Sequence, residues 1–195
     1  TLFRSLVITG RGTDLNLIPR YALPRRAIQW ATQRADGLVT VCDALRDDLA
    51  KLGVARERAR VLRNGVDLTV FRRDKGARER LRDTDDGPVL LSVGHLIPRK
   101  GHDLVIRLVA RRTAGTLWIV GTGPEEARLR ALAAELGVSH RVQFVGAVAH
   151  ELLPAYYSAA DVLVLASSRE GWPNVLLESL ACGTPVVASP VNGTP

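Results

Sequence analysis

Short apolar runs alternate along the chain with longer segments in which apolar residues recur every three or four positions. The short runs predict strands and the longer segments predict helices. The predicted strands lie at 6–9, 38–42, 59–62, 89–93, 116–120, 141–145, 162–166 and 185–188, and the predicted helices at 24–34, 43–52, 102–112, 124–136, 150–158 and 174–182. Regular alternation of this kind predicts an α/β fold, in which helices cover parallel sheets on both faces. Strands such as Val89–Val93 are almost entirely apolar, which is typical of strands buried on both faces.

A strongly charged stretch, residues 72–87, separates the two series of predicted elements. We therefore expect residues 6–68 to form part of a first lobe, 69–87 to link the lobes, and 88–195 to form the second. A helical turn is expected inside the link, at Arg78–Arg82. The sequence has no Met, begins just before a strand and stops in a turn-forming string. We accordingly expect a fragment, inactive by itself if the parent is an enzyme, with an incomplete first lobe and a truncated but nearly complete second lobe.

The composition is that of ordinary globular material, with 46% hydrophobic and 24% charged residues in a chain of 195. No apolar run approaches the roughly 18 residues that indicate a membrane-spanning helix. Cys42 and Cys182 lie far apart and lack metal-ligand spacing. They are interpreted as small buried residues in a reducing compartment.

The net charge of +7 is concentrated in residues 1–87, which hold 18 Lys or Arg against 12 acids, whereas residues 88–195 hold 9 against 8. Such a region could attract anionic lipid or a phosphorylated acceptor. It could equally reflect an Arg-rich composition, since 24 of the 27 basic residues are Arg. Nucleic-acid binding is not expected, because no basic stripe interleaved with aromatic residues occurs.

The most informative segment follows the predicted strand 162–166. Glu170 and Glu178 lie eight residues apart, and Pro173 is suited to the first turn of a helix that Gly183 can end. Glu170 then falls at the carboxyl end of a strand, where parallel sheets place their ligands, and Glu178 falls on the next helix. Free backbone N–H groups at the start of that helix would form an anion site. Taken singly, each Glu is more simply a solvated charge.

This segment resembles the E-x7-E motif of retaining glycosyltransferases of the GT-B fold, family 4 type. The resemblance implies two Rossmann-like lobes and transfer of a hexose from a nucleotide diphosphate sugar to an acceptor, with retention of anomeric configuration. In such enzymes the first Glu faces the donor sugar and the second binds the ribose hydroxyls, roles that fall to Glu170 and Glu178. The backbone that would approach the sugar and diphosphate belongs to Gly171, Trp172, Pro173, Asn174 and Val175.

Two further loops resemble parts of the same donor site. The segment from Gly94 to Gly101 is similar to the family pattern G-R-x-x-x-x-K-G, with Gly94 and Lys100 in place. His95 stands where Arg is usual, and Arg99 could supply the missing charge. A Lys here would stabilise the charge that grows on the leaving diphosphate. The turn Gly121-Thr122-Gly123-Pro124 is similar to the family's G-x-G-P turn, which predicts that Gly121 and Gly123 let the backbone approach the donor.

The first lobe offers weaker signals. In Thr9–Asp14, Arg11 and Asp14 could reach the acceptor, or Asp14 could simply cap a helix. Asn64-Gly65 lies in a segment similar to the one that joins the lobes in this family, and by itself Asn-Gly favours a turn with positive φ. The pair Tyr156 and Tyr157 is interpreted as packing.

The resemblance also implies the partners. We expect a nucleotide sugar donor, a carbohydrate or lipid-linked acceptor, and no metal or other cofactor, because cationic side chains and helix amino ends would hold the diphosphate. The expected location is cytoplasmic, with peripheral contact at the inner face of an anionic membrane as a further interpretation.

Two alternatives remain open from the sequence. A dinucleotide-dependent dehydrogenase would need Gly-x-Gly-x-x-Gly after the first strand, but Gly121-Thr122-Gly123 is followed by Glu at 126. A non-catalytic module that binds nucleotide sugars would not need Glu170, Glu178 and Lys100 together, and their presence disfavours it.

Overall fold

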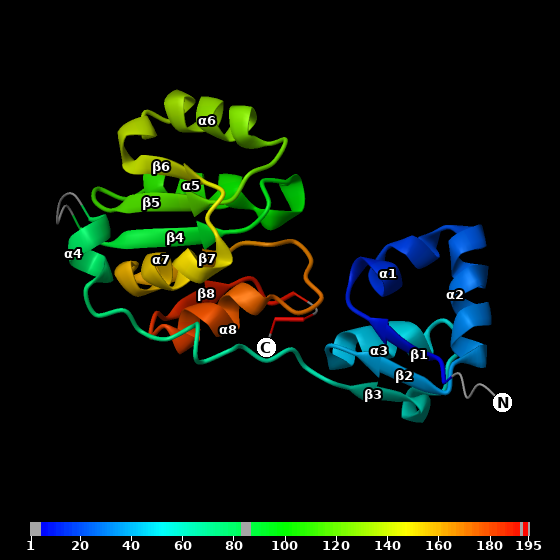
Figure 1. Cartoon of the computed structure of the whole chain (residues 1–195). Helices are drawn as coiled ribbons and strands as arrows, with labels where there is room; N and C mark the ends of the chain where they lie inside the picture. Colours follow the sequence, from blue (N-terminus) through cyan, green and yellow to red (C-terminus); the bar gives the residue numbers. More distant parts are fainter. Residues whose placement is uncertain (1–4, 83–86, 192, 195) are drawn as a thin grey trace. The chain divides into compact units, whose positions relative to one another are not determined.

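The computed structural model describes residues 5–82, 87–191 and 193–194, and these residues form two compact units (Figure 1). The first unit comprises the described parts of Thr1–Asn64, Arg169–Pro173 and Pro190–Pro195. The second comprises the described parts of Gly65–Ser168 and Asn174–Ser189. The division therefore falls directly after Asn64, and the described part of the expected link 69–87 belongs to the second unit.

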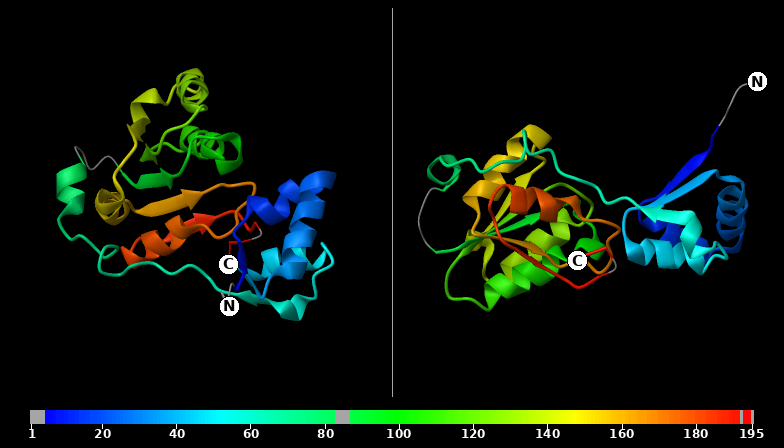
Figure 2. Two further views of the ribbon diagram at one scale, coloured as in Figure 1. Left: turned by 45° about the vertical axis from the view of Figure 1, so that its right-hand side comes forward. Right: turned by 90° about the horizontal axis from the view of Figure 1, so that it is seen from below.

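The first unit is built on a parallel sheet of three strands in the order β1-β2-β3. Its elements are β1 (Val7–Gly10), α1 (Thr13–Asn16), α2 (Ala22–Arg34), β2 (Gly37–Thr40), α3 (Asp43–Ala50) and β3 (Ala59–Val61), with 3-10 turns at Ile18–Arg20 and Arg56–Arg58. The helices contribute Leu15, Ile28 and Leu45 to a core that also contains Leu38 of β2. The edge strand β1, blue in Figure 2, is poorly covered, since its Val7 is 60% exposed.

The second unit is built on a parallel sheet of five strands in the order β6-β5-β4-β7-β8. Its elements are α4 (Ala77–Leu81), β4 (Val89–Val93), α5 (His102–Ala110), β5 (Thr116–Val120), α6 (Glu126–Glu135), β6 (Val142–Gly146), α7 (Leu153–Ala159), β7 (Val162–Leu165), α8 (Asn174–Ala181) and β8 (Val186–Ala188), with 3-10 turns at Pro98–Lys100, Ser139–Arg141 and His150–Leu152.

Helices cover both faces of this second sheet. Residues of α4, α7 and α8 form one core cluster with Leu91 of β4, and residues of α5 and α6 form another with Leu90. All five residues of β4 are consequently buried, as its apolar sequence indicates. The order of the strands reverses at β4, so the carboxyl ends of β4 and β7 mark the place where such sheets bind ligands.

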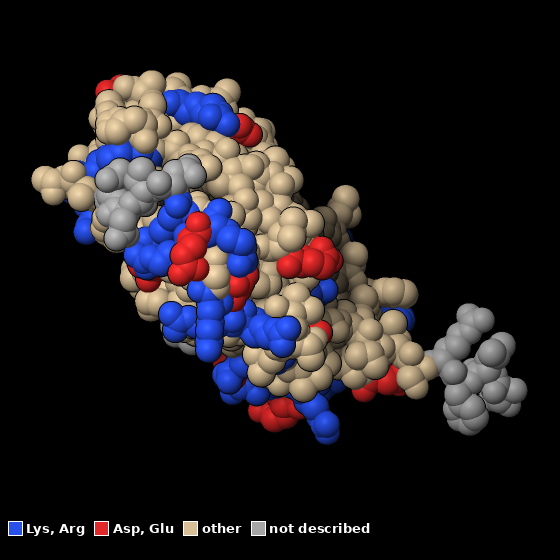
Figure 3. All heavy atoms as spheres, turned by 60° about the vertical axis from the view of Figure 1, so that its left-hand side comes forward, with Lys and Arg blue, Asp and Glu red and all other residues tan. Residues whose placement is uncertain are grey.

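Basic and acidic side chains intermingle around α4 (Figure 3). Arg78 and Arg82 pair with Asp161 at 2.9 and 2.6 Å, and Arg80 pairs with Asp74. The buried guanidinium of Arg82 also donates to the carbonyl oxygen of Ala159 from Nε at 2.9 Å. Part of the basic charge of residues 72–87 therefore fastens α4 to the second unit.

The predicted strands and helices are confirmed, with ends that differ by a few residues. Of the two interpretations of Asn64-Gly65, the turn with positive φ is wrong, because neither residue has positive φ and residues 62–67 are irregular. The chain does pass from the first unit to the second directly after Asn64. Cys42 and Cys182 are both buried and free, as expected. Among the helices in the described ranges, none has the length and apolarity required to cross a bilayer.

Candidate functional site

The loop after β4 is held by backbone hydrogen bonds on two sides. Gly94 N donates to Val120 O at 2.9 Å and Leu96 N donates to Thr122 O at 2.9 Å, so the pairing of β4 with β5 continues beyond both strands. On the other side, Ser168 N donates to Arg99 O at 2.8 Å, which connects the loop to the end of β7. The segment that carries the predicted phosphate-site residues is thus fixed at the carboxyl edge of the sheet.

Gly121 and Gly123 make this close pairing of loops possible. A Cβ atom at Gly121 would collide with the carbonyl oxygen of Gly94, and one at Gly123 would lie 2.7 Å from the amide nitrogen of Leu96. Gly121 also has a φ of +135°, which side chains rarely adopt. The structure therefore explains both glycines by contact between the two loops, whereas the sequence analysis assigned them to the approach of a donor.

Lys100 folds over the first glycine of the same loop. A Cβ at Gly94 would lie 3.5 Å from Cδ and Cε of Lys100, so the aliphatic part of the side chain packs on that backbone. Lys100 and Arg99 end the 3-10 turn Pro98–Lys100, and both side chains are half-buried. His95, by contrast, is exposed. The loop thus brings Gly94 and Lys100 together.

Glu178 lies in the second turn of α8, and its side chain is almost fully buried, with 8% exposed. Its Oε2 accepts a hydrogen bond from the hydroxyl of Tyr157 on α7 at 2.7 Å. Within the described part of the chain, Oε1 accepts none. Burial and the nearby Glu178 carboxylate raise the pKa of Tyr157, which keeps this hydroxyl a donor. A fixed carboxylate with one oxygen to spare can accept hydrogen bonds from a diol.

Tyr157 is the functional candidate that the sequence analysis missed. Packing accounts for its neighbour Tyr156, whose ring meets that of Trp118 edge-on at 6.0 Å. The ring of Tyr157 is fully buried as well, but its hydroxyl orients Glu178. The distance of 21 residues between the two partners gives no local sequence signal for this bond.

The segment Arg169–Pro173, directly before α8, belongs to the first unit. Glu170 is 6% exposed, and Gly171 packs so closely on Arg11 that a Cβ would collide with the Arg11 carbonyl oxygen. Trp172 packs on the core of the first unit, and its Nε1 donates to Asn64 O at 3.2 Å. The buried Pro173 ends this segment, and Asn174 and Val175 begin α8 in the second unit.

Asp14 lies in the first turn of α1 (Thr13–Asn16) and does not cap that helix, whose N-cap position is Gly12. Oδ1 of Asp14 accepts a hydrogen bond from Gly12 N at 2.6 Å, and Oδ2 accepts one from Arg11 N at 3.0 Å. Both bonds organise the turn before the short helix α1, which the sequence analysis did not predict.

A buried histidine lies directly under the loop after β4. Nδ1 of His102, the first residue of α5, is 2.9 Å from Oγ of Ser92 in β4. Burial lowers the pKa of His102 to about 4, so the ring is neutral at physiological pH. This neutral pair joins the strand to the helix that follows the loop.

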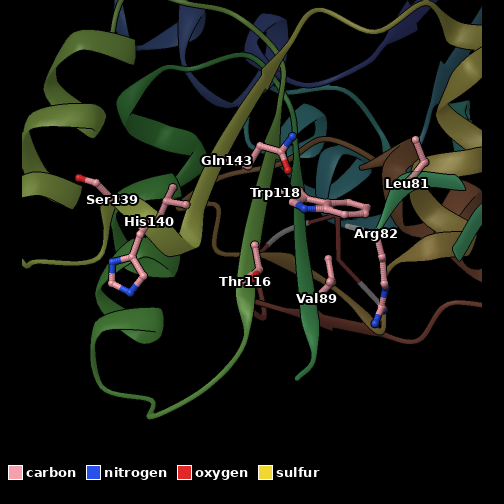
Figure 4. Close-up of a pocket in the computed structure, with 9 residues that line it drawn as sticks. Leu81, Arg82, Val89, Thr116, Trp118, Ser139, His140 and Gln143 are labelled. Atoms are coloured by element: carbon pink, nitrogen blue, oxygen red, sulfur yellow. The ribbon is translucent and has the colours of Figure 1, made fainter. Parts of the chain in front are cut away.

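A separate hollow of about 380 Å³ opens at the amino ends of β4, β5 and β6 (Figure 4). Trp118, Gln143 and Arg82 line it. It lies at the opposite end of the strands from Gly94 and Lys100, and ligands of parallel sheets bind at the carboxyl end. We therefore assign it no part in the site.

The described ranges contain no cluster of three or more His, Cys, Asp or Glu side chains that could hold a metal ion. The sequence does contain one Asp-x-Asp triplet, Asp83-Thr84-Asp85, which lies outside the described residues.

Comparison with protein families decides the identity of the chain. Residues 74–195 match the family described as glycosyl transferases group 1, and residues 5–70 match glycosyltransferase family 4. The chain belongs to the group 1 glycosyl transferases. The predicted α/β, Rossmann-like GT-B fold class is confirmed by the likeness to solved glycosyltransferases.

Individual relatives of this glycosyltransferase chain support the same family. It is 42% identical over 176 residues to D-inositol 3-phosphate glycosyltransferase of Acidothermus cellulolyticus, covering 82% of this chain and 39% of the relative. It is 39% identical over 145 residues to GDP-mannose-dependent alpha-(1-6)-phosphatidylinositol monomannoside mannosyltransferase of Mycolicibacterium smegmatis, covering 67% of this chain and 38% of that protein. The chain thus spans well under half the length of these relatives.

A solved structure provides a third comparison. Anabaena Alr3699/HepE in complex with UDP and glucose matches with a TM-score of 0.86 and 25% identity, over 97% of this chain and 54% of that chain.

Proposed function

We propose that this chain carries the donor site of a retaining glycosyltransferase, which moves a hexose from a nucleotide diphosphate sugar to an acceptor. The observation that carries the proposal is the buried carboxylate of Glu178 in the second turn of α8, which Tyr157 orients. Hydroxyls of a ribose can donate to its spare oxygen, and burial strengthens such charge-assisted bonds. Family membership, the GDP-mannose dependence named for one relative and the UDP bound in a similar solved structure support a nucleotide sugar.

The other predicted residues take complementary roles in this proposal. Lys100, with Arg99 beside it, meets the diphosphate, and Glu170 faces the sugar. Backbone groups complete the contacts to sugar and diphosphate, and they belong to Gly94, Gly121, Gly123, Gly171, Trp172, Pro173, Asn174 and Val175.

The proposed reaction breaks the bond between the anomeric carbon and a diphosphate oxygen and forms a bond between that carbon and an acceptor oxygen. The electron pair of the broken bond leaves with the diphosphate. The acceptor attacks the face from which the diphosphate departs and passes its proton to the leaving phosphate, so the configuration is retained. Lys100 stabilises the negative charge that grows on the leaving group.

The partners proposed are a nucleotide sugar and a carbohydrate or lipid-linked acceptor, with no metal ion and a cytoplasmic location. The lipid alternative is supported by the mannosyltransferase relative, whose name specifies a phosphatidylinositol mannoside. A dehydrogenase is disfavoured, because Gly121-Thr122-Gly123 follows β5, the second strand of its sheet, instead of the first.

Calorimetric titration with UDP-glucose and with GDP-mannose tests the donor site. For the sugar nucleotide that binds, we expect Glu178→Ala to weaken binding by about 1.5–3 kcal/mol, because charge-assisted hydrogen bonds to ribose are lost. Glu135→Ala removes an exposed carboxylate from α6 and is the matched control. Equal affinities of the two variants would remove Glu178 from the site.

Kinetics distinguish an enzyme from a module that only binds. In a protein that turns the donor over, Lys100→Ala should lower kcat more than it raises KM, because the charge it meets is larger in the transition state. Donor binding without any release of nucleoside diphosphate, even by the full-length protein, would favour the non-catalytic alternative.

A further inference from the structure

Helix α2 has a second apolar side that does not contact the core of its unit. Ile28 packs against the core cluster and Thr32 is buried, whereas Leu23 and Trp30 are 79% and 59% exposed. At 100° per residue, Leu23, Ala27 and Trp30 fall on one side of the helix, opposite Ile28 and Thr32. Large apolar side chains thus line the side of α2 that faces solvent.

The charged residues of α2 and of the turn before it are all basic. Residues 15–35 contain no Asp or Glu, and their four basic residues are Arg20, Arg25, Arg26 and Arg34. The guanidinium carbon of Arg34 lies 4.4 Å from the centre of the Trp30 ring, which places a cation next to the exposed aromatic group. Around α4, by contrast, ion pairs with Asp74 and Asp161 offset the arginines.

A hollow of about 250 Å³ beside the start of α2 adds to this basic surface. Its lining includes Arg20, Arg25 and Lys51, and Nζ of Lys51 pairs with Asp48 at 2.7 Å. Within the residues that the structure describes, neither arginine forms an ion pair. Two guanidinium groups at one opening suit phosphate, which Arg binds through parallel hydrogen bonds.

We propose that the α2 face, defined as Tyr21, Leu23, Arg26, Trp30 and Arg34, docks the protein on an anionic phospholipid surface. Leucine and aromatic side chains would enter the boundary between headgroups and acyl chains, and the arginines would meet phosphates. Charge complementarity selects this occupant. A second copy of the same acid-free face would be repelled, whereas an anionic leaflet attracts it. The inference does not depend on the proposed glycosyl transfer.

Co-sedimentation with vesicles tests the proposal. The chain should sediment with vesicles of phosphatidylcholine mixed with phosphatidylglycerol and remain in the supernatant with phosphatidylcholine alone. One basic residue near such a surface contributes about fivefold to binding, so Arg26→Glu with Arg34→Glu should weaken it at least about 25-fold. Arg107→Glu with Arg112→Glu changes the net charge equally at exposed sites of the second unit and should weaken it far less.

The apolar part of the α2 face is tested by a second pair of variants. Leu23→Ala with Trp30→Ala should weaken binding to the mixed vesicles at least about tenfold, since burial of the two side chains is lost. Leu104→Ala with Leu108→Ala removes two exposed leucines from α5 and is the matched control. Circular dichroism and urea unfolding should show that every variant is folded like the parent chain.

Three results would overturn the proposal. The first is absence of wild-type binding to the mixed vesicles at low salt. The second is equal loss of binding in the α2 variants and in their controls, which would indicate general attraction of a basic protein. The third is a dimer in analytical ultracentrifugation that the α2 variants abolish without any vesicle binding, because the α2 face would then be an interface between copies. Brominated lipids that quench the fluorescence of wild type but not of Trp30→Phe would support the insertion directly.

Discussion

The hydroxyl of Tyr157 is the donor that orients the carboxylate of Glu178. We expect Tyr157→Phe to destabilise the protein by about 1–3 kcal/mol, because the buried carboxylate then lacks its hydrogen bond. Donor binding should also weaken, since Glu178 is no longer held in one orientation. Tyr156→Phe is the matched control, because the Tyr156 ring packs on Trp118 and its hydroxyl has no hydrogen bond to another described residue. Urea unfolding and calorimetry measure the two effects, and equal results for both variants would contradict the assignment.

The buried pair of His102 and Ser92 predicts a pH dependence of stability. The pKa of His102 is about 4 in the folded protein, against 6.5 for an ordinary His, so the unfolded chain binds the proton more tightly. The stabilisation by the neutral ring is complete above pH 6.5 and is lost as the pH falls from 6.5 to 4. Over this range the free energy of unfolding should fall by roughly 3 kcal/mol.

Urea unfolding at a series of pH values checks this expectation. The free energy of unfolding of His102→Gln should fall less steeply than that of wild type between pH 6.5 and 4, since Gln cannot take up the proton. His140→Gln removes an exposed ring and should keep the wild-type slope. Identical slopes for wild type and His102→Gln would show that the histidine is not the titrating group.

At the level of single residues, the sequence indicated contacts of the candidate site only where neighbouring positions in the chain form them. Gly94 and Lys100 meet because one short loop contains both. The bond between Tyr157 and Glu178 joins two helices separated by a strand, and such a contact follows from packing of the whole unit. The failed turn at Asn64-Gly65 has a similar cause, because Trp172 binds the Asn64 carbonyl from far along the chain.

The loops after β4 and β5 act as one element, because their backbones touch at Gly121 and Gly123. Gly123→Ala should destabilise the second unit by about 1–3 kcal/mol or more, since the new methyl group overlaps the Leu96 backbone. It should also weaken donor binding by displacing the loop that carries Lys100. Gly65→Ala is the control, because its Cβ would meet nothing within 4 Å and its φ is not positive. Thermal unfolding measures the difference, and similar unfolding midpoints for the two variants would refute the steric argument.

Strands and helices were predictable because their periodicity is local. The five apolar residues of β4 and the helical spacing in α5 both follow directly from burial. The helix α1 escaped prediction because it has four residues and depends on the Asp14 turn before it. The assignment of Arg169–Pro173 to the first unit was equally beyond local patterns, since it rests on contacts with residues such as Arg11 and Asn64.

The two units differ in how well their sheets are protected. The first has three strands and an edge strand β1 whose Val7 is largely exposed, whereas the second has five strands with helices on both faces. Less apolar surface is therefore buried per residue in the first unit, and we expect it to unfold at a lower urea concentration. Amide exchange should likewise be slowest in β4 and β5 and faster in β1.

Tryptophan fluorescence can follow each unit separately, because Trp118 belongs to the second unit and Trp30 and Trp172 belong to the first. The Trp118→Phe variant should report an early transition, and a variant with Phe at positions 30 and 172 should report a later one. The chain passes between the units four times, and the segment Arg169–Pro173, which contains Glu170, belongs to the first unit. Unfolding of the first unit should therefore release the Glu170 segment while Tyr157 and Glu178 stay bonded, so that nucleotide binding weakens without being abolished. Coincident transitions in the two variants would show instead that the units unfold as one.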